Sequence, residues 1–172
     1  MAFNLLRRIG RSYLVRNSVF FSVVYSLSEY SQQTIIGDGH DVETIKRYGK
    51  WGILEGGRTY VYFRILDWLL PGTAVRTIVK KVVIDIAMTP VFVSSFYIAM
   101  SAMEGKYDLF AEAKEKTIPT CLAGITIWTP LQAINFKFVS PKFRGVYTGS
   151  VYMLWANTLC LLKRMEVSTE SV

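Results

Sequence analysis

The chain has 172 residues, of which 51% are hydrophobic and 14% aromatic, and its net charge is +7. This length predicts a single domain covering residues 1–172. An apolar, aromatic-rich and basic composition favours an integral membrane protein next to anionic lipid. It disfavours a nucleic-acid-binding protein, because the basic residues lie between apolar runs instead of forming one continuous stripe.

The residue types that catalysis and metal binding need are scarce. The one histidine, His40, lies in a Gly/Asp-rich loop that is typical of a solvated turn. Cys121 and Cys160 are far apart, lie inside apolar segments and are expected to be buried thiols. No nucleophile–base pair, phosphate-binding loop or metal cluster is visible. We therefore expect no enzymatic activity, no cofactor and no metal site.

The N-terminal segment, residues 1–16, contains four arginines and no acidic residue. An Arg-rich, acid-free start without a secretory apolar region resembles a mitochondrial targeting sequence.

Five segments are predicted to be helices that cross a bilayer. The third has 22 residues and one charge, Asp85, and is long enough for the hydrocarbon core of about 30 Å. A water-soluble bundle of amphipathic helices is the alternative, but this third segment has no polar face wide enough to meet water. The five segments cover residues 17–36, 51–70, 82–103, 118–138 and 146–162.

The second segment is the most polar of the five. Glu55 and Arg58 are three residues apart, as are Arg64 and Asp67, which is the spacing of side chains that pair on a helix. Such pairing would make these charges tolerable in the interior of a membrane bundle.

The segment 104–116, between the third and fourth spans, alternates charged and apolar residues and predicts a short interfacial helix. The charges that flank the spans alternate between positive and non-positive along the chain. Five crossings require this pattern under the positive-inside rule. Four crossings with one half-buried helix remain open.

Polar residues inside the third and fourth segments are the main candidates for a functional site. Asp85 lies near one helical face with Lys81, Thr89 and Ser95, which would line a pore or cavity. Alternatively, Asp85 pairs with Lys81 or Arg58 near the end of the helix.

Gln132 and Asn135 share one face of the fourth segment. They would either line the same pathway or join helices by hydrogen bonds.

A small-residue pattern marks the start of the fifth segment. Gly145 and Gly149 form a GxxxG motif, and Ala156 and Cys160 continue the stripe. Such a stripe permits close helix packing, here expected within the chain more than between copies.

Two motif regions carry a resemblance to a known family. Six residues have the spacing of the pattern Trp-Pro-x-x-Gln-x-x-Asn-Phe-x-x-Val-Pro-x-x-x-Arg, although Pro130 and Pro141 are each shifted by one position. They are Trp128, Gln132, Asn135, Phe136, Val139 and Arg144. Upstream matches are Leu66, Asp67, Pro71, Gly72, Lys80, Lys81 and Asp85. The chain thus resembles the Mpv-seventeen family, which includes the twenty-two-kilodalton peroxisomal membrane protein. It departs from the family's pattern at Tyr60, where the family has His, and at Ile86, where it has Gln.

This resemblance implies an all-α integral membrane bundle with four to five transmembrane helices. It implies the mitochondrial inner membrane, or alternatively the peroxisomal membrane. The first functional hypothesis is a weakly selective small-solute channel lined by Asp85, Gln132 and Asn135, with Glu55 and Arg58 as gating or pairing charges. The second is a structural or assembly subunit of a larger mitochondrial membrane complex or of the mitochondrial ribosome.

The expected partners follow from the same hypotheses. They are a bilayer with anionic lipid and either a protein complex or a second copy of the chain. Nucleic acid is expected only indirectly, through a ribosome. A docked subunit would use its basic face and the Gly145/Gly149 helix.

Overall fold

The computed structural model describes residues 13–37 and 39–170, and in the last helix it describes side chains as far as residue 158. Residues 1–12 of the basic N-terminal segment therefore lie outside the described residues, and so does the side chain of Cys160.

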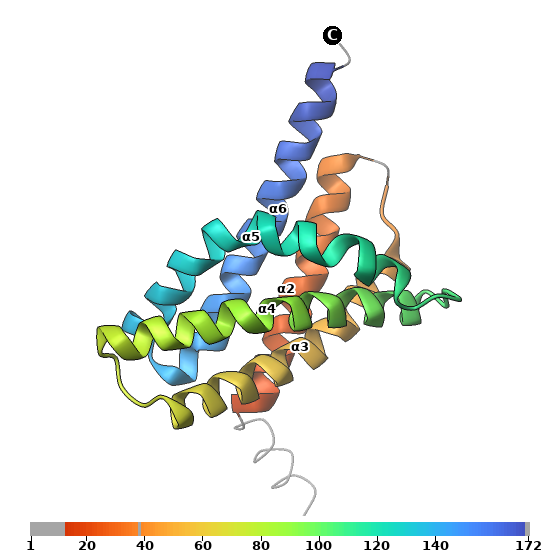
Figure 1. The fold of residues 1–172 in the computed structure, drawn as a ribbon. Helices are drawn as coiled ribbons and strands as arrows, with labels where there is room; N and C mark the ends of the chain where they lie inside the picture. The colour runs from red at the N-terminus through yellow and green to blue at the C-terminus, as the bar shows by residue number, and fades with distance from the viewer. Residues whose placement is uncertain (1–12, 38, 171–172) are drawn as a thin grey trace, which may run out of the picture. The chain divides into compact units, whose positions relative to one another are not determined.

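The expected all-α fold is confirmed. The described residues form five α-helices and one short 3₁₀-helix, and no strand occurs among them (Figure 1). The helices are α2 (Tyr13–Ile36), α3 (Val42–Leu69), α4 (Val75–Met103), α5 (Ala111–Phe138), η1 (Pro141–Phe143) and α6 (Arg144–Glu170).

The chain divides into two compact units. The first unit comprises residues 1–60 and 145–172, and therefore holds α2, the first part of α3 and nearly all of α6. The second unit, residues 61–144, holds the last part of α3 together with α4, α5 and η1. The single domain expected from the length stays a prediction.

Glycine and aspartate set the boundary between α2 and α3. Gly37 has a φ of +86° and its N–H donates to the carbonyl of Gln33 over 2.9 Å, which ends α2 in a left-handed cap. The Asp41 carboxylate then accepts hydrogen bonds from the N–H groups of Glu43 and Thr44 at the start of α3. The Thr44 hydroxyl also donates to this carboxylate, over 2.6 Å. That bond first of all, together with the two N–H bonds, holds the pKa of Asp41 below its ordinary value.

Proline and aspartate set the later boundaries. Pro71 follows the end of α3, and Gly72 turns the chain with a φ of +91°. Asp108 accepts from the N–H groups of Phe110 and Ala111 at the start of α5. At the end of α5 the chain becomes extended at Val139, and Pro141 opens η1.

Several helices begin before the predicted spans, because a helix can start in a polar stretch that hydropathy does not mark. Helices α3, α4 and α5 begin at residues 42, 75 and 111 instead of 51, 82 and 118. The separate interfacial helix expected over 104–116 does not form. Residues 104–110 are the turn between α4 and α5, and residues 111–116 are the first turns of α5. Asp108 starts that helix before its apolar part begins.

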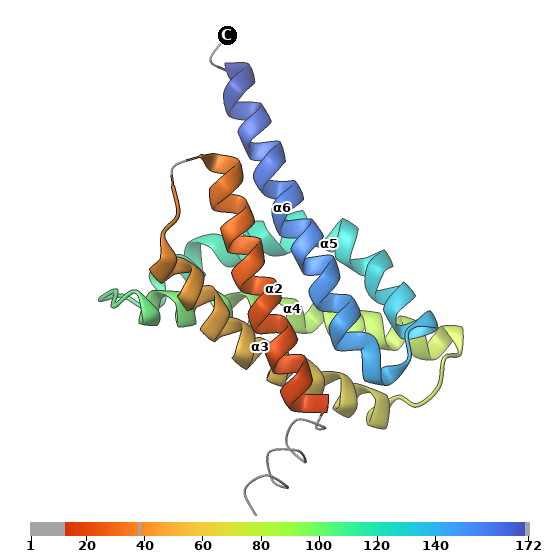
Figure 2. The same ribbon diagram turned by 180° about the vertical axis from the view of Figure 1, so that it is seen from behind.

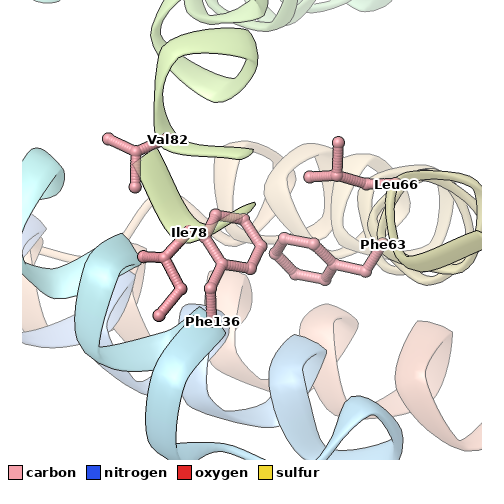
Figure 3. Packing of buried hydrophobic residues seen from close by; sticks show 5 residues of the cluster. All are labelled: Phe63, Leu66, Ile78, Val82 and Phe136. Carbon is pink, nitrogen blue, oxygen red and sulfur yellow. The ribbon is translucent and has the colours of Figure 1, made fainter. Parts of the chain in front are cut away.

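The core of the second unit lies where α3, α4 and α5 meet (Figure 3). Phe63 of α3 and Phe136 of α5 meet edge-to-face, with ring centroids 5.8 Å apart. Ile78 and Val82 of α4 and Leu66 of α3 complete this cluster. It joins the two family-like motif regions, because Leu66 belongs to one and Phe136 to the other.

In the first unit, two glycines of α3 allow a close contact with the backbone of α2. A Cβ atom at Gly52 would lie 2.6 Å from the carbonyl oxygen of Phe21, and one at Gly56 would lie 2.6 Å from that of Asn17. The Asn17 side chain also donates to the carbonyl of Gly56. Figure 2 shows α2 beside both α3 and α6 within this unit. The backbones of α2 and α3 therefore touch directly.

By length and composition, one helix among the described residues is suited to crossing a membrane. It is α4, in which an 18-residue window has a mean hydropathy of 1.8 and only 6% of that window is buried. The clearest of the five predicted spans is therefore the one that meets this criterion.

Candidate functional site

Asp85 is the centre of a polar group in the second unit. Its two carboxylate oxygens accept hydrogen bonds from Tyr62 of α3, over 3.1 Å, and from Gln132 of α5, over 3.0 Å. The Gln132 side-chain oxygen in turn accepts from Asn135 over 2.9 Å. Asn135 is fully buried and Gln132 nearly so. The structure thus brings together Asp85, Gln132 and Asn135, which are separated by up to 50 positions in the sequence, and adds Tyr62.

A buried ion cluster lies beside this group. The Asp67 carboxylate of α3 pairs with Lys81 of α4, over 2.7 Å, and with Arg144 at the start of α6. Lys81 is 1% exposed and Arg144 is 2% exposed. Both cations also lie over the ring of Phe136, at 5.7 and 5.3 Å from its centroid. Arg144 additionally donates to the carbonyls of Val139 and Phe136, and so fixes the turn between α5 and α6.

The ion cluster corrects two predicted pairings. Asp67 was expected to pair with Arg64 within α3, but Arg64 is exposed and Asp67 turns to other helices. Lys81 was one expected partner of Asp85 and instead pairs with Asp67. Helical spacing alone could not predict the pairing of Asp67, because its two partner cations lie in segments that are distant in the sequence.

Glu55 and Arg58 belong to the first unit. They form an ion pair with each other, as their spacing predicts. The Thr59 hydroxyl donates to Glu55 over 3.2 Å, and the Arg58 guanidinium lies 5.5 Å from the centroid of the Trp51 ring.

A row of polar contacts continues from Asp85 along the seam between α4 and α5. The hydroxyls of Ser94 and Thr117 lie 3.0 Å apart, and those of Tyr97 and Thr120 lie 2.9 Å apart. The Ser101 hydroxyl donates to Glu112 over 3.2 Å. In the expected stripe, Thr89 and Ser95 instead donate to carbonyls of their own helix.

The row could have been predicted by pairing the third and fourth predicted segments as antiparallel helices joined by a turn near residue 107. In that antiparallel arrangement Ser94, Tyr97 and Ser101 face polar residues of α5, as Asp85 faces Gln132. Each segment by itself shows only scattered hydroxyls, which are common in membrane helices.

The row ends in a surface cluster at the turn between α4 and α5. Lys116 and Lys106 both lie within salt-bridge distance of Glu112, at 2.8 and 3.1 Å, and Lys106 also pairs with Glu104. The hydrogen bonds from Lys116 and Lys106 lower the pKa of Glu112 to about 2. Glu112 therefore stays ionised at all physiological pH values.

The GxxxG glycines of α6 face α2 inside the first unit. A Cβ at Gly149 would lie 2.8 Å from the Phe20 ring and 3.2 Å from the Phe21 ring. A Cβ at Gly145 would overlap the side chain of Asn17. Ala156, further along α6, is half-buried.

Comparison with known proteins identifies the family. The family model described as Mpv17 / PMP22 matches residues 101–160. An Mpv17-like protein from Bos taurus is 34% identical over 158 residues, which are 91% of this chain and 81% of that protein. The chain belongs to the Mpv17 / PMP22 family.

Other members of the family are more distant relatives. The mitochondrial inner membrane protein Mpv17 of Xenopus laevis is 26% identical over 70% of this chain and 71% of its own length. Peroxisomal membrane protein 2 of Bos taurus is 25% identical over 67% of this chain and 61% of its own length. These relatives confirm the expected localisation, which is the mitochondrial inner membrane with the peroxisomal membrane as its alternative. No solved structure is significantly similar to the chain.

The motif residues of the Mpv17 / PMP22 family fall into structural roles in this chain. Asp67, Lys81 and Arg144 form the ion cluster, and Leu66 and Phe136 lie in the core of the second unit. The remaining motif residues are placed around them. Pro71, Gly72 and Lys80 are exposed near the turn between α3 and α4, Trp128 lies over Gly124 in α5, and Val139 caps α5.

Proposed function

We propose that the protein is an integral membrane bundle of the mitochondrial inner membrane that conducts small polar solutes with weak selectivity. The observation that carries this proposal is the row of polar contacts along the seam between α4 and α5. We propose no catalytic role for the chain.

The distribution of polar residues in the second unit supports a membrane location. Ser101, Thr117 and Gln132 are buried, whereas Leu122 and Val83 are exposed. Water-soluble proteins bury apolar side chains and expose polar ones, and intramembrane polar residues instead face the bundle interior. We therefore extend the proposed membrane location from α4 to the other helices, which gives four or five spans. Each of the other helices is long enough, with at least 24 residues in α2, α3, α5 and α6. Such helices are at least about 36 Å long.

The ion cluster and the polar row together have the length that a membrane pathway needs. On α4 they extend from Lys81, in the ion cluster, to Ser101, in the last contact of the row. Twenty residues of helix rise by about 30 Å, which equals the thickness of the hydrocarbon core. A shorter polar patch would serve helix association alone.

An aromatic contact interrupts the row near its middle. Phe92 meets the Tyr62 ring edge-on at 5.1 Å, between the Asp85 group and the Ser94 and Tyr97 hydroxyls. In this proposal Phe92 is a hydrophobic constriction that opens for passage. The Asp85 carboxylate on one side of it favours cations over anions, whereas Glu55 and Arg58 in the first unit neutralise each other.

Single-channel current from the purified chain in a planar bilayer tests the proposal. Wild-type protein is expected to show discrete openings with a preference for cations, and Asp85→Asn is expected to lower that preference several-fold, because it removes the carboxylate and keeps the shape. Glu115→Gln, which removes one exposed carboxylate from α5, is the matched control and should leave the preference unchanged. Openings whose ion preference is the same in all three proteins would contradict the role of Asp85.

The alternative role of a structural or assembly subunit has less support. One of its two expected docking surfaces, the Gly145/Gly149 face of α6, packs against α2 within the chain. A silent bilayer in which insertion of the protein has been verified would favour this alternative. Crosslinking in the native membrane would then identify its neighbours.

A further inference from the structure

One end of the second unit carries a group of exposed cations. The helices α3, α4 and α5 run back and forth, so the end of α3, the start of α4 and the end of α5 lie at this end, as Asp67, Lys81 and Arg144 confirm by their contact. The surface that we call the basic end consists of Arg76, Lys80, Lys137 and Lys142, all exposed.

The segments that form the basic end contain almost no acidic residues. Asp67 is the sole acidic residue in 61–80 and 133–144, and its carboxylate is already shared by the buried Lys81 and Arg144. Within the part of the chain that the structure describes, no acidic side chain pairs with any cation of the basic end. The basic end therefore presents a positive field that an anion from outside the chain can neutralise.

The opposite end of the second unit has a different charge pattern. Residues 104–116 contain three basic and four acidic residues. There Lys106 and Lys116 pair with Glu104 and Glu112. The excess of positive over negative charge therefore lies at the basic end and not at the opposite end of the unit.

Exposed aromatic rings lie among the cations of the basic end. Trp68 is 79% exposed and Phe138 is 72% exposed, and Phe143 is half-exposed. The ammonium of Lys137 lies 5.1 Å from the centroid of the Phe138 ring, and that of Lys142 lies 5.0 Å from the Phe143 ring. Exposed rings with neighbouring ammonium groups are typical of a membrane–water interface, where the ring meets acyl chains and the cation meets phosphate.

We propose that the basic end binds the headgroup phosphates of anionic phospholipids and holds this end of the second unit at the anionic leaflet. Apolar side chains of α4 next to it, Val75 and Val79, are exposed and would contact the acyl chains. These apolar and aromatic groups favour lipid over nucleic acid, which would meet only the cations. The inference rests on the membrane location in the proposed function, but it does not require solute conduction.

Lipid retention by the full-length chain tests the inference. The protein is released from nanodiscs that contain phosphatidylcholine with a minor fraction of phosphatidylglycerol, and bound lipid is measured by native mass spectrometry. Wild type is expected to retain phosphatidylglycerol selectively. The double variant Lys137→Gln/Lys142→Gln should bind it about 30-fold more weakly, since each cation near an anionic surface contributes about 1 kcal/mol.

Two further variants separate the site from general effects. Lys50→Gln/Lys114→Gln removes two exposed lysines elsewhere and should bind like wild type. Lys137→Arg/Lys142→Arg keeps both charges and should retain the lipid, and a normal helical circular dichroism spectrum verifies that each variant folds.

Three outcomes would overturn the inference. They are equal loss in both Gln variants, selective retention that survives in Lys137→Gln/Lys142→Gln, and displacement of the lipid by millimolar inorganic phosphate, which would indicate a site for free anions. If the second outcome is found and the same variant also loses binding to an RNA oligonucleotide, the basic end is assigned to nucleic acid instead. Because no solute flux is measured, failure of this inference is distinguishable from failure of the channel proposal.

Discussion

At the scale of single residues, Asp67 holds together three segments of the second unit. Replacing it by asparagine leaves Lys81 and Arg144 buried without a counter-charge. We expect Asp67→Asn to lower the free energy of unfolding by about 3–5 kcal/mol, the usual effect of removing one partner of a buried ion pair. The midpoint of unfolding in detergent, followed by circular dichroism, measures this loss.

A double-mutant cycle separates charge from packing at this position. Lys81→Gln in the Asp67→Asn background removes one of the two unpaired cations. It should therefore lower the free energy of unfolding by less than Lys81→Gln does in the wild-type protein. Costs that simply add would show that Asp67 and Lys81 do not interact energetically.

Some residues of the candidate site can be predicted from the sequence and others cannot. Asp85, Gln132 and Asn135 are recognisable because polar residues in apolar helices are few, and the structure places them in one group. Tyr62 is not recognisable, because a tyrosine near a segment end looks like an interfacial residue until α3 is placed beside α4. The pairing of Asp67 was mispredicted for the same reason.

At the scale of helices, the contact between α2 and α3 depends on glycine. A Cβ at Gly52 would meet backbone atoms of Phe21 and Ser22 at 2.6–2.8 Å, and backbone cannot move aside as a side chain can. Gly52→Ala should therefore destabilise the protein by about 1–3 kcal/mol, the usual cost of overpacking. The loss of stability is measured as a shift in the unfolding midpoint when a denaturing detergent is added to the protein in a mild detergent.

Gly57→Ala is the matched control on the same helix. Its added Cβ would meet only the Ser18 hydroxyl, at 3.4 Å, which is ordinary contact. Alanine favours a helix by about 0.5–1 kcal/mol over glycine, so this variant should be neutral or slightly stabilised. Equal losses at both positions would mean that glycine matters through the backbone of α3 and not through contact with α2.

Helix existence was easier to predict than helix length. Apolar runs marked all five helices, but α3 and α5 start well before those runs, at caps made by Asp41 and Asp108. Hydropathy detects the part of a helix that would meet lipid, whereas capping chemistry decides where the helix begins. The polar first turns of α5 were therefore mistaken for a separate helix.

At the scale of the whole molecule, α3 is the helix whose location in a membrane is hardest to explain. It contains charged residues and does not meet the composition criterion for a membrane span that α4 meets. Leu54 of α3 is nonetheless 64% exposed. If α3 crosses the bilayer, that exposure is to lipid and not to water.

Cysteine labelling in intact membranes tests whether α3 lies in lipid or in water. With both native cysteines replaced by serine, Leu54→Cys should resist a water-soluble maleimide until detergent is added, because the reagent needs an ionised thiol in water. Tyr107→Cys, at the fully exposed turn between α4 and α5, should react when the reagent has access to its side of the membrane. Rapid labelling of Leu54→Cys without detergent would place α3 in water, and would favour a peripheral helical protein over a bundle with four or five spans.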